Sequence, residues 1–163
     1  MKKLLFSALA IMMLLSVTTD KVIKGKVVKV IDGNTFQVKG EDKQMHKILL
    51  MGIDSPELEQ EFGREAKKFL EKLILGKTVT LDFKGTDRFG NPLVDVRIDG
   101  TKDPRIELLK EGLAWTTENN PPANLEQYRS SAQLRNKGLW QQRNPIPPWI
   151  FRKEKGDLQQ ESI

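Results

Sequence analysis

Residues 22–38 read VIKGKVVKVIDGNTFQV, and this stretch decides the fold. Around Val28 and Val30, apolar and polar side chains alternate with the period of two that is typical of a half-buried strand. Asp32-Gly33-Asn34 is a turn signal, and residues 35–38 start a second strand. Strands and turns that follow one another so closely predict an antiparallel meander.

In the sequence that follows this stretch, the spacing of the apolar residues alternates between that of a strand and that of a helix. Residues 45–53 (MHKILLMGI) predict a third, more buried strand, whereas the apolar residues of 63–75 recur at helical spacing and end at Gly76. Asp103 is suited to cap a short helix that has Pro104 in its first position. In full, the prediction comprises strands at 22–31, 35–38, 45–53, 78–83 and 93–98, and helices at 63–75, 104–111 and 123–137.

This order of elements fits a small barrel closed by a helix. Periodicity alone supports an α+β fold with an antiparallel sheet. The barrel is preferred because strands this short must close on themselves or be covered. We therefore predict a five-stranded OB-type Greek-key β-barrel with three helices.

Composition limits the classes of function. The chain has 163 residues, of which 38% are hydrophobic and 30% charged, which suits one soluble domain. There is no cysteine, so disulfides, thiolate zinc sites and cysteine catalysis are excluded. His46 is the single histidine, which excludes any site that needs two imidazoles. The formal net charge of +5 is compatible with a polyanionic partner.

The N-terminus resembles a targeting segment. Lys2 and Lys3 precede the apolar run LLFSALAIMMLL, which predicts a secretory signal over residues 1–19 and an exported protein, periplasmic or extracellular. Because no clean A-x-A site is present, an uncleaved membrane anchor is the alternative. Removal of the segment leaves 25 basic and 22 acidic residues, a net charge of +3. Nucleic-acid binding would then depend on a local basic patch. The folded domain is expected over 20–152, followed by a flexible tail at 153–163.

Seven segments carry a resemblance to one family. Together they are similar to the staphylococcal nuclease (thermonuclease-like) family, in particular its exported bacterial members, over about residues 22–152. The resemblance implies an OB-fold barrel with three helices and a calcium-dependent phosphodiesterase that cleaves DNA and RNA. In chain order, the segments are VVKVIDGNTFQV, LMGIDSPE, FGREAKKFL, GKTVTLDF, TDRFG, ELLKEGLAW and GLW…NPIPPW.

Part of the acidic half of such a site is retained. Phosphodiester hydrolysis builds negative charge, which a cation held by carboxylates can stabilise while a carboxylate base activates water. The resemblance places Asp54 as a metal ligand, Ser55 as a donor of its backbone carbonyl and Glu57 as the general base. Asp32 is retained nearby, but Asn34 stands at the position of a metal-binding Asp. Asn offers no charge, so calcium binding is expected to be possible but weak.

The basic half of the site is substituted. The two positions that correspond to the family's catalytic arginines hold Leu49 and Asn91, and a phosphate-binding Tyr is replaced by Phe89. An arginine that stabilises phosphoryl transfer contributes roughly 10³ to 10⁵ in rate. The combined loss is therefore on the order of 10⁵-fold, although such losses do not add.

Three other cations could replace the missing arginines. Lys47 lies two residues before Leu49 and hence on the same face of its strand. Arg88 lies in the adjacent loop, and Arg97 follows it in the next strand. A lysine would supply charge without the bidentate geometry of a guanidinium.

Two functions remain open on the sequence alone. One is an impaired, nuclease-like protein, a monomer that binds nucleic acid, another phosphate-bearing ligand or a protein at the barrel face. The other is a divergent calcium-dependent phosphodiesterase.

Two groups of residues also have simpler interpretations. Asp54 and Glu57 could serve only to cap the turn at Pro56. The three tryptophans, which could stack bases, are more simply explained by packing.

Overall fold

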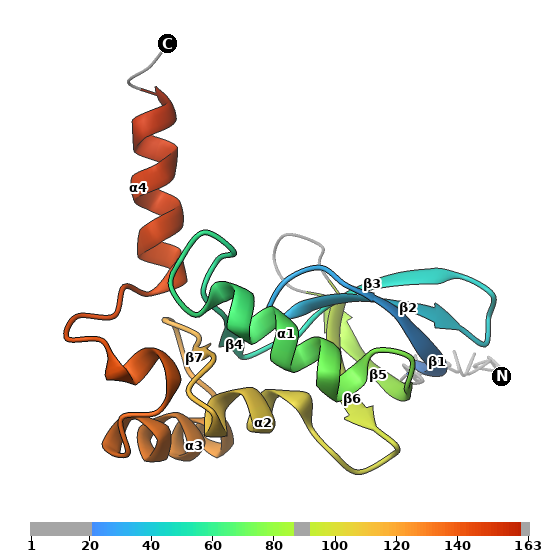
Figure 1. The fold of residues 1–163 in the computed structure, drawn as a ribbon. Helices are drawn as coiled ribbons and strands as arrows, with labels where there is room; N and C mark the ends of the chain where they lie inside the picture. The colour runs from blue at the N-terminus through green and yellow to red at the C-terminus, as the bar shows by residue number, and fades with distance from the viewer. Residues whose placement is uncertain (1–20, 87–91, 161–163) are drawn as a thin grey trace, which may run out of the picture.

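A five-stranded antiparallel sheet forms the body of the molecule (Figure 1). The computed structural model describes residues 21–86 and 92–160. The strand order β3-β2-β1-β5-β6 places the first strand at the centre, and β3 and β6 approach each other, as closure of a barrel requires. The predicted α+β fold of OB type is confirmed. The strands are β1 (Lys21–Val30), β2 (Thr35–Gly40), β3 (Met45–Leu49), β5 (Thr78–Thr86) and β6 (Pro92–Ile98).

The inner face of the sheet forms the core. Val27, Phe36, Val38 and Ile48 are almost completely buried, and exposed lysines lie next to Val27, Val38 and Ile48. The alternation is interrupted at Val28, where a β-bulge shifts the register between β1 and β2. A bulge bends the strand and increases its twist, which helps so short a sheet to curl.

The predicted third strand at 45–53 is interrupted, and this expectation is corrected. β3 ends at Leu49, and a separate short strand β4 (Ile53–Asp54) pairs with β7 (Trp115–Thr116). The break lies at Gly52, whose φ of +82° is a left-handed conformation that favours glycine. As a result, Asp54 leaves the main sheet and lies opposite Trp115.

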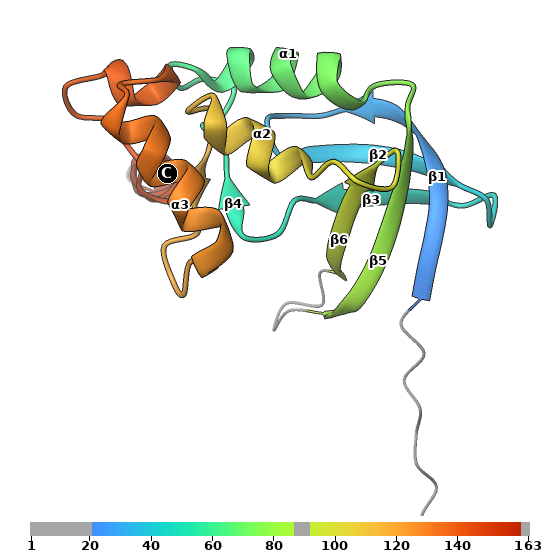
Figure 2. The ribbon, with the colours of Figure 1, turned by 90° about the horizontal axis from the view of Figure 1, so that it is seen from below.

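Helices cover one side of the sheet. Figure 2 shows α1 lying along the sheet with α2 beside it and α3 beyond α2. In α1, Ala66, Leu70 and Ile74 are fully buried against the core, as the helical spacing predicts. The side chain of Asp103 accepts a hydrogen bond from the backbone N–H of Arg105, so the predicted N-cap is present. The helices that precede the C-terminal segment are α1 (Gly63–Ile74), α2 (Pro104–Lys110), α3 (Ala123–Leu134) and the 3₁₀ turn η1 (Gly138–Gln141).

A fourth helix, α4 (Pro148–Gln160), occupies most of the segment from residue 153 that the sequence predicts as a flexible tail. Proline is favoured in the first turn of a helix, where its missing N–H has no partner to lose. Arg152 and Lys155 then tie the helix to carboxylates of the 54–59 segment. Figure 1 shows α4 extending away from the rest of the molecule. The predicted N-terminal segment, 1–19, lies outside the described residues. Within 21–86 and 92–160, no helix has the length and apolarity to cross a membrane.

Candidate active site

The turn after β1, the end of β3, the segment that follows β4 and helix α4 enclose one pocket of about 300 Å³. All five residues that the sequence predicts for the acidic half of the site gather here, although they come from separate parts of the chain. The pocket is lined by Asp32, Asn34, Thr35, Leu49, Ile53, Asp54, Ser55, Pro56, Glu57, Thr117 and Arg152.

Hydrogen bonds fix the turn that carries Asn34. Its backbone N–H donates to Oδ1 of Asp32 at 3.0 Å, and its carbonyl accepts from the N–H of Leu50 at 2.8 Å. Gly33 is packed so closely that a Cβ there would lie 2.6 Å from Cβ of Ser55. The turn is therefore locked against the 53–57 segment, and one oxygen of Asp32 is already used in holding it.

A second turn positions Glu57. Its N–H donates to Oε1 of Gln60 at 2.8 Å, and its carbonyl accepts from the N–H of the same residue at 2.9 Å. Gly63, the first residue of α1, passes so close that a Cβ would lie 1.8 Å from the carbonyl oxygen of Glu57. The glycine at position 63 is therefore a steric requirement of this turn.

Arg152, from α4, lies directly on the acidic pair. One of its amino groups, Nη2, donates to Oδ2 of Asp54 at 2.7 Å, while Nη1 donates to Oδ1 of Asp54 at 3.3 Å and to Oε1 of Glu57 at 2.7 Å. The hydrogen bonds that Arg152 donates to the Asp54 carboxylate, together with the one to Glu57, raise the pKa of Arg152, although its partial burial acts against them. The side chain is 50% exposed, so solvent screens the pair.

The environment of Asp54 is less favourable to charge. Burial raises the pKa of this carboxyl above its ordinary value, and the hydrogen bonds and charge of Arg152 offset only part of the rise. The nearby charges of Glu57 and Asp32 act in the same direction as burial. Among the described residues that line it, the pocket therefore concentrates negative charge around one cation, Arg152.

The present arrangement does not fit a calcium ion. Calcium takes about six to eight oxygen ligands. In the ranges 21–86 and 92–160, no cluster of three or more His, Asp or Glu side chains is arranged to hold a metal. Arg152 already occupies three oxygens of Asp54 and Glu57, and Asp32 shares an oxygen with its own turn. The hydroxyl of Ser55 is buried and has no hydrogen-bond partner in the described structure, so an unused oxygen does remain beside the pocket.

Two of the three cations that the sequence predicts as replacements lie in the described residues, and neither Lys47 nor Arg97 lines the pocket. Lys47 is exposed on the outer face of β3. Arg97 is held elsewhere, by Asp95 and Asp103, at 3.1 and 2.9 Å. Leu49 lines the pocket and is 46% exposed. The remaining predicted residues, Arg88, Phe89 and Asn91, lie outside the described residues.

Two arginines in and near the site are not among the residues that the sequence pattern predicts. Arg152 lies three residues after Trp149, the end of the NPIPPW segment, and its 98-residue separation from Asp54 leaves no local signal. Arg105 is buried, binds Asp103 and Asp95 at 2.6 Å each, and donates to the carbonyl of Met51 at 3.3 Å. It thereby braces the chain just before β4.

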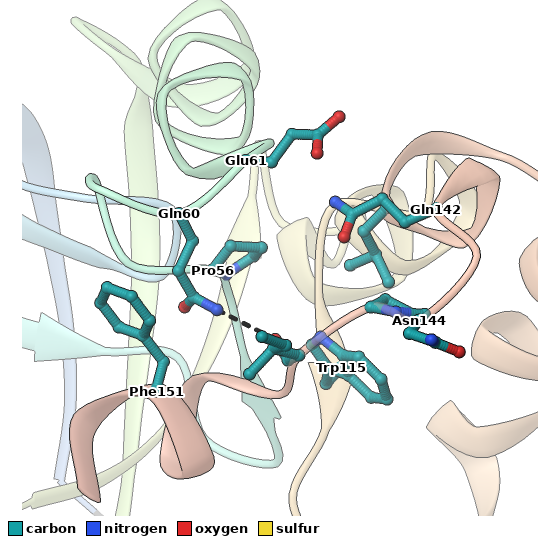
Figure 3. A pocket seen from close by; sticks show the side chains of 10 residues that line it. Pro56, Gln60, Glu61, Trp115, Gln142, Asn144 and Phe151 are labelled. Carbon is teal, nitrogen blue, oxygen red and sulfur yellow. Dashed lines mark hydrogen bonds between the residues drawn. The ribbon is translucent and has the colours of Figure 1, made fainter. Parts of the chain in front are cut away.

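A second pocket of about 260 Å³ adjoins the first and shares Pro56 with it (Figure 3). Trp115 and Phe151 contribute aromatic surface, and Gln60 donates from Nε2 to the carbonyl of Ile146 at 2.9 Å. Trp115 also packs edge to face against two other tryptophans, with its ring centroid 4.4 Å from that of Trp140 and 5.8 Å from that of Trp149. These contacts give the three tryptophans a packing role.

Comparison with known families decides the relationship. The family model described as staphylococcal nuclease homologue matches residues 47–142. The chain belongs to the staphylococcal nuclease family. An uncharacterized endonuclease of Escherichia coli O157:H7 is 35% identical over 134 residues, 82% of this chain and 87% of the relative. A second uncharacterized endonuclease, from Haemophilus influenzae, is 35% identical over 155 residues, 94% of this chain and 86% of the relative.

Plant members of the staphylococcal nuclease family are also similar. The probable staphylococcal-like nuclease CAN1 of Oryza sativa subsp. japonica is 34% identical over 120 residues, which are 72% of this chain and 36% of that longer protein. The resemblance read from the sequence segments is therefore confirmed. A nuclease-like function follows from the family, whereas the state of the catalytic centre depends on this chain's own residues.

Proposed function

We propose that this staphylococcal nuclease homologue binds nucleic acid at the barrel face and hydrolyses phosphodiesters slowly or not at all. The observation that carries the proposal is the contact of Arg152 with both Asp54 and Glu57. A guanidinium there satisfies the carboxylates that the family resemblance assigns to a metal and to the attacking water. We expect calcium to bind weakly, because it must displace this cation.

The substitutions around the pocket support the same proposal. Leu49 presents an apolar side chain to the pocket where the resemblance implies a guanidinium, and Asn34 lacks the charge of an aspartate. Losing one preorganised donor to the transition state costs roughly 2.7–4 kcal/mol. A remaining rate far below that of an intact family member is therefore expected.

A divergent metal-dependent phosphodiesterase is the second candidate, and one observation favours it. Arg152 adds a cation to the pocket, and its half-exposed side chain is free enough in space to turn from the carboxylates to a phosphate. Glu57 would then be released to act as a base on water. This candidate requires that Glu57→Ala and removal of metal by a chelator each abolish cleavage.

A cleavage assay with single-stranded DNA and a calcium titration tests the proposal. Turnover within about tenfold of an active family member would overturn it, since the expected loss is on the order of 10⁵. The sharper variant restores the substituted positions together, as Asn34→Asp, Leu49→Arg and Asn91→Arg. Recovered cleavage in this variant would support the assignment of all three positions, and no recovery in a folded variant would contradict it.

We also propose that the protein acts outside the cytoplasm. The support is the basic start followed by an apolar run in residues 1–15, which is typical of an export signal. Cell fractionation, with N-terminal sequencing of the exported chain, would test the location and the cleavage site.

A further inference from the structure

Five exposed lysines share the outer surface of β1, β2 and β3, here called the lysine face. On each strand, the residues next to these lysines point inward: Val27, Val38 and Ile48 are buried beside them. Alternation of side chains along a strand therefore places all five on the same surface. The lysine face consists of Lys24, Lys26, Lys29, Lys39 and Lys47.

The strand register brings these lysines into rows. Lys26 is the direct partner of Lys39 across β1 and β2. Lys29 lies opposite Gln37, which in turn lies opposite Lys47 on β3. Adjacent strands are about 4.8 Å apart, and like charges directly opposite each other destabilise a sheet. Stability of the fold therefore does not explain the arrangement.

None of the five lysines forms an ion pair within 21–86 and 92–160. Cations on the adjoining strands behave differently, because Lys84 pairs with Asp82 at 2.7 Å and Arg97 pairs with Asp95. Acidic residues do occur near one end of the face, in the turn between β2 and β3. Glu41 is exposed there, and Asp42 contacts His46 at 3.0 Å. Away from this turn, the face presents uncompensated positive charge.

We propose that the lysine face binds the phosphate backbone of a nucleic acid and leads it toward the pocket of Asp54 and Glu57. Lys47 and Leu49 project from the same side of β3, and Leu49 lines that pocket. A strand that follows the lysines away from the β2–β3 turn thus reaches the acidic pair. This inference rests on the proposed function, to which it adds a binding surface and the direction in which that surface leads to the pocket.

The residues of the face favour a nucleic acid over an anionic membrane. Segments that lie in a membrane interface anchor themselves with Trp, Phe or Leu beside their cations. The described outward side chains of β1 to β3 include no aromatic residue, and the exposed apolar ones are not partners of one another in the sheet; they are Val22, Val28, Met45 and Leu49. Rows of ammonium groups across a sheet instead match a repeating phosphate backbone, whose neutralisation releases counterions.

The test compares two triple variants that remove equal charge. Lys26→Gln, Lys29→Gln and Lys39→Gln alter the centre of the face, while Lys67→Gln, Lys68→Gln and Lys72→Gln alter α1. Binding of fluorescent single-stranded and duplex oligonucleotides is measured by anisotropy with a metal chelator present, so that cleavage cannot contribute. The salt concentration is varied from about 50 to 200 mM.

For the face variant, the slope of log K against log salt should fall by about 2 on a single strand, since each lost phosphate contact contributes about 0.7. At about 0.1 M salt this corresponds to roughly a hundredfold weaker binding. The α1 variant should bind like the wild type. Replacement of the same three face lysines by arginine should keep the affinity, because the positive charge is retained.

Each other outcome has a distinct meaning. If the wild type binds oligonucleotides and the face variant binds equally well, the role of the lysine face is overturned while the proposed function stands. If the wild type binds no oligonucleotide, both are wrong. If it binds only vesicles of phosphatidylglycerol, the face is a lipid-binding surface and the inference is overturned. Fast cleavage in the presence of calcium would contradict the proposed low activity, but it would not contradict nucleic-acid binding by the lysine face.

Discussion

Arg152 on α4 grips both carboxylate oxygens of Asp54, although 98 residues separate them in the chain. The same guanidinium reaches Glu57, so a single side chain forms ion pairs with both of the acids that the family resemblance assigns to the site. A divalent cation and Arg152 therefore compete for the same oxygens, and this competition can be measured without any assay of cleavage.

We predict that Arg152→Gln binds terbium, a luminescent substitute for calcium, more tightly than the wild type. A half-exposed ion pair contributes up to about 1 kcal/mol, which corresponds to about fivefold in affinity. Luminescence sensitised by tryptophan reports binding directly, because Trp115 lies opposite Asp54 in the β4–β7 pair.

Lys155→Gln is the matched control for that measurement, since Lys155 lies on the same helix and pairs with Glu59 outside the pocket. It should leave terbium affinity unchanged. An equal gain in both variants would mean that the general charge of α4 acts on the metal, and that Arg152 holds no special position.

The pH dependence of stability provides a second prediction, at Asp54. Its folded pKa is raised above the ordinary value of 3.8, chiefly by burial, so the folded state holds the proton more tightly than the unfolded state. As pH rises from about 3.8 through the folded pKa, ionisation therefore removes stability, opposite to the usual behaviour of a carboxylate. Relative to Asp54→Asn, the wild type should lose stability over this window in urea unfolding at a series of pH values. A constant difference between the two proteins would show that the carboxyl has an unshifted pKa.

How much of the site the sequence reveals depends on how local each part is. Asp54, Ser55 and Glu57 belong to one short segment, so a motif is enough to find them, and the structure brings them into one pocket with Asp32 and Asn34. The contact with Arg152 depends on where α4 docks, and its sequence of prolines and charges gives no local indication. The helix within the predicted tail is not foreseen for the same reason, since its ion pairs are made to distant carboxylates.

The fold is easier to predict from the sequence than the site, because its periodic strands and the N-cap at Asp103 are local features. The break between β3 and β4 is an exception that the sequence does not predict. Residues 48–53 are apolar, so that 45–53 reads as one strand, and the left-handed backbone at Gly52 divides it. The role of Arg105, which donates to the Met51 carbonyl, likewise appears only once α2 is packed beside β6.

We predict that Asp103→Ala destabilises the protein by about 3–5 kcal/mol, the usual cost of removing one partner from a buried ion pair. The Asp103 side chain is 7% exposed, caps α2 and binds both Arg105 and Arg97. Asp103→Asn keeps an oxygen for the cap and should cost less. Urea unfolding measures all three proteins.

Glu107→Ala is the control within the same helix. Glu107 pairs with Lys102 and Lys110, which are both half exposed, so its loss should cost less than about 1 kcal/mol. Similar losses for Asp103→Ala and Glu107→Ala would mean that the buried pair of Asp103 and Arg105 has no particular weight in holding the chain before β4.

Two glycine-to-alanine changes should have opposite signs. At Gly63 a Cβ would lie 1.8 Å from the carbonyl oxygen of Glu57 and 2.6 Å from its carbon, both of them backbone atoms that cannot turn aside. We expect Gly63→Ala to cost more than about 3 kcal/mol, beyond the ordinary range for overpacking, and to displace the turn that holds Glu57 against Arg152. At Gly156, within α4, no atom lies within 4 Å of the added methyl group, so Gly156→Ala should stabilise the helix by about 0.5–1 kcal/mol. Unfolding monitored by circular dichroism compares the two with the wild type. A Gly63→Ala protein with the wild-type midpoint would show that the Glu57 turn yields easily, and the position of the acidic pair would then not depend on the close approach of α1.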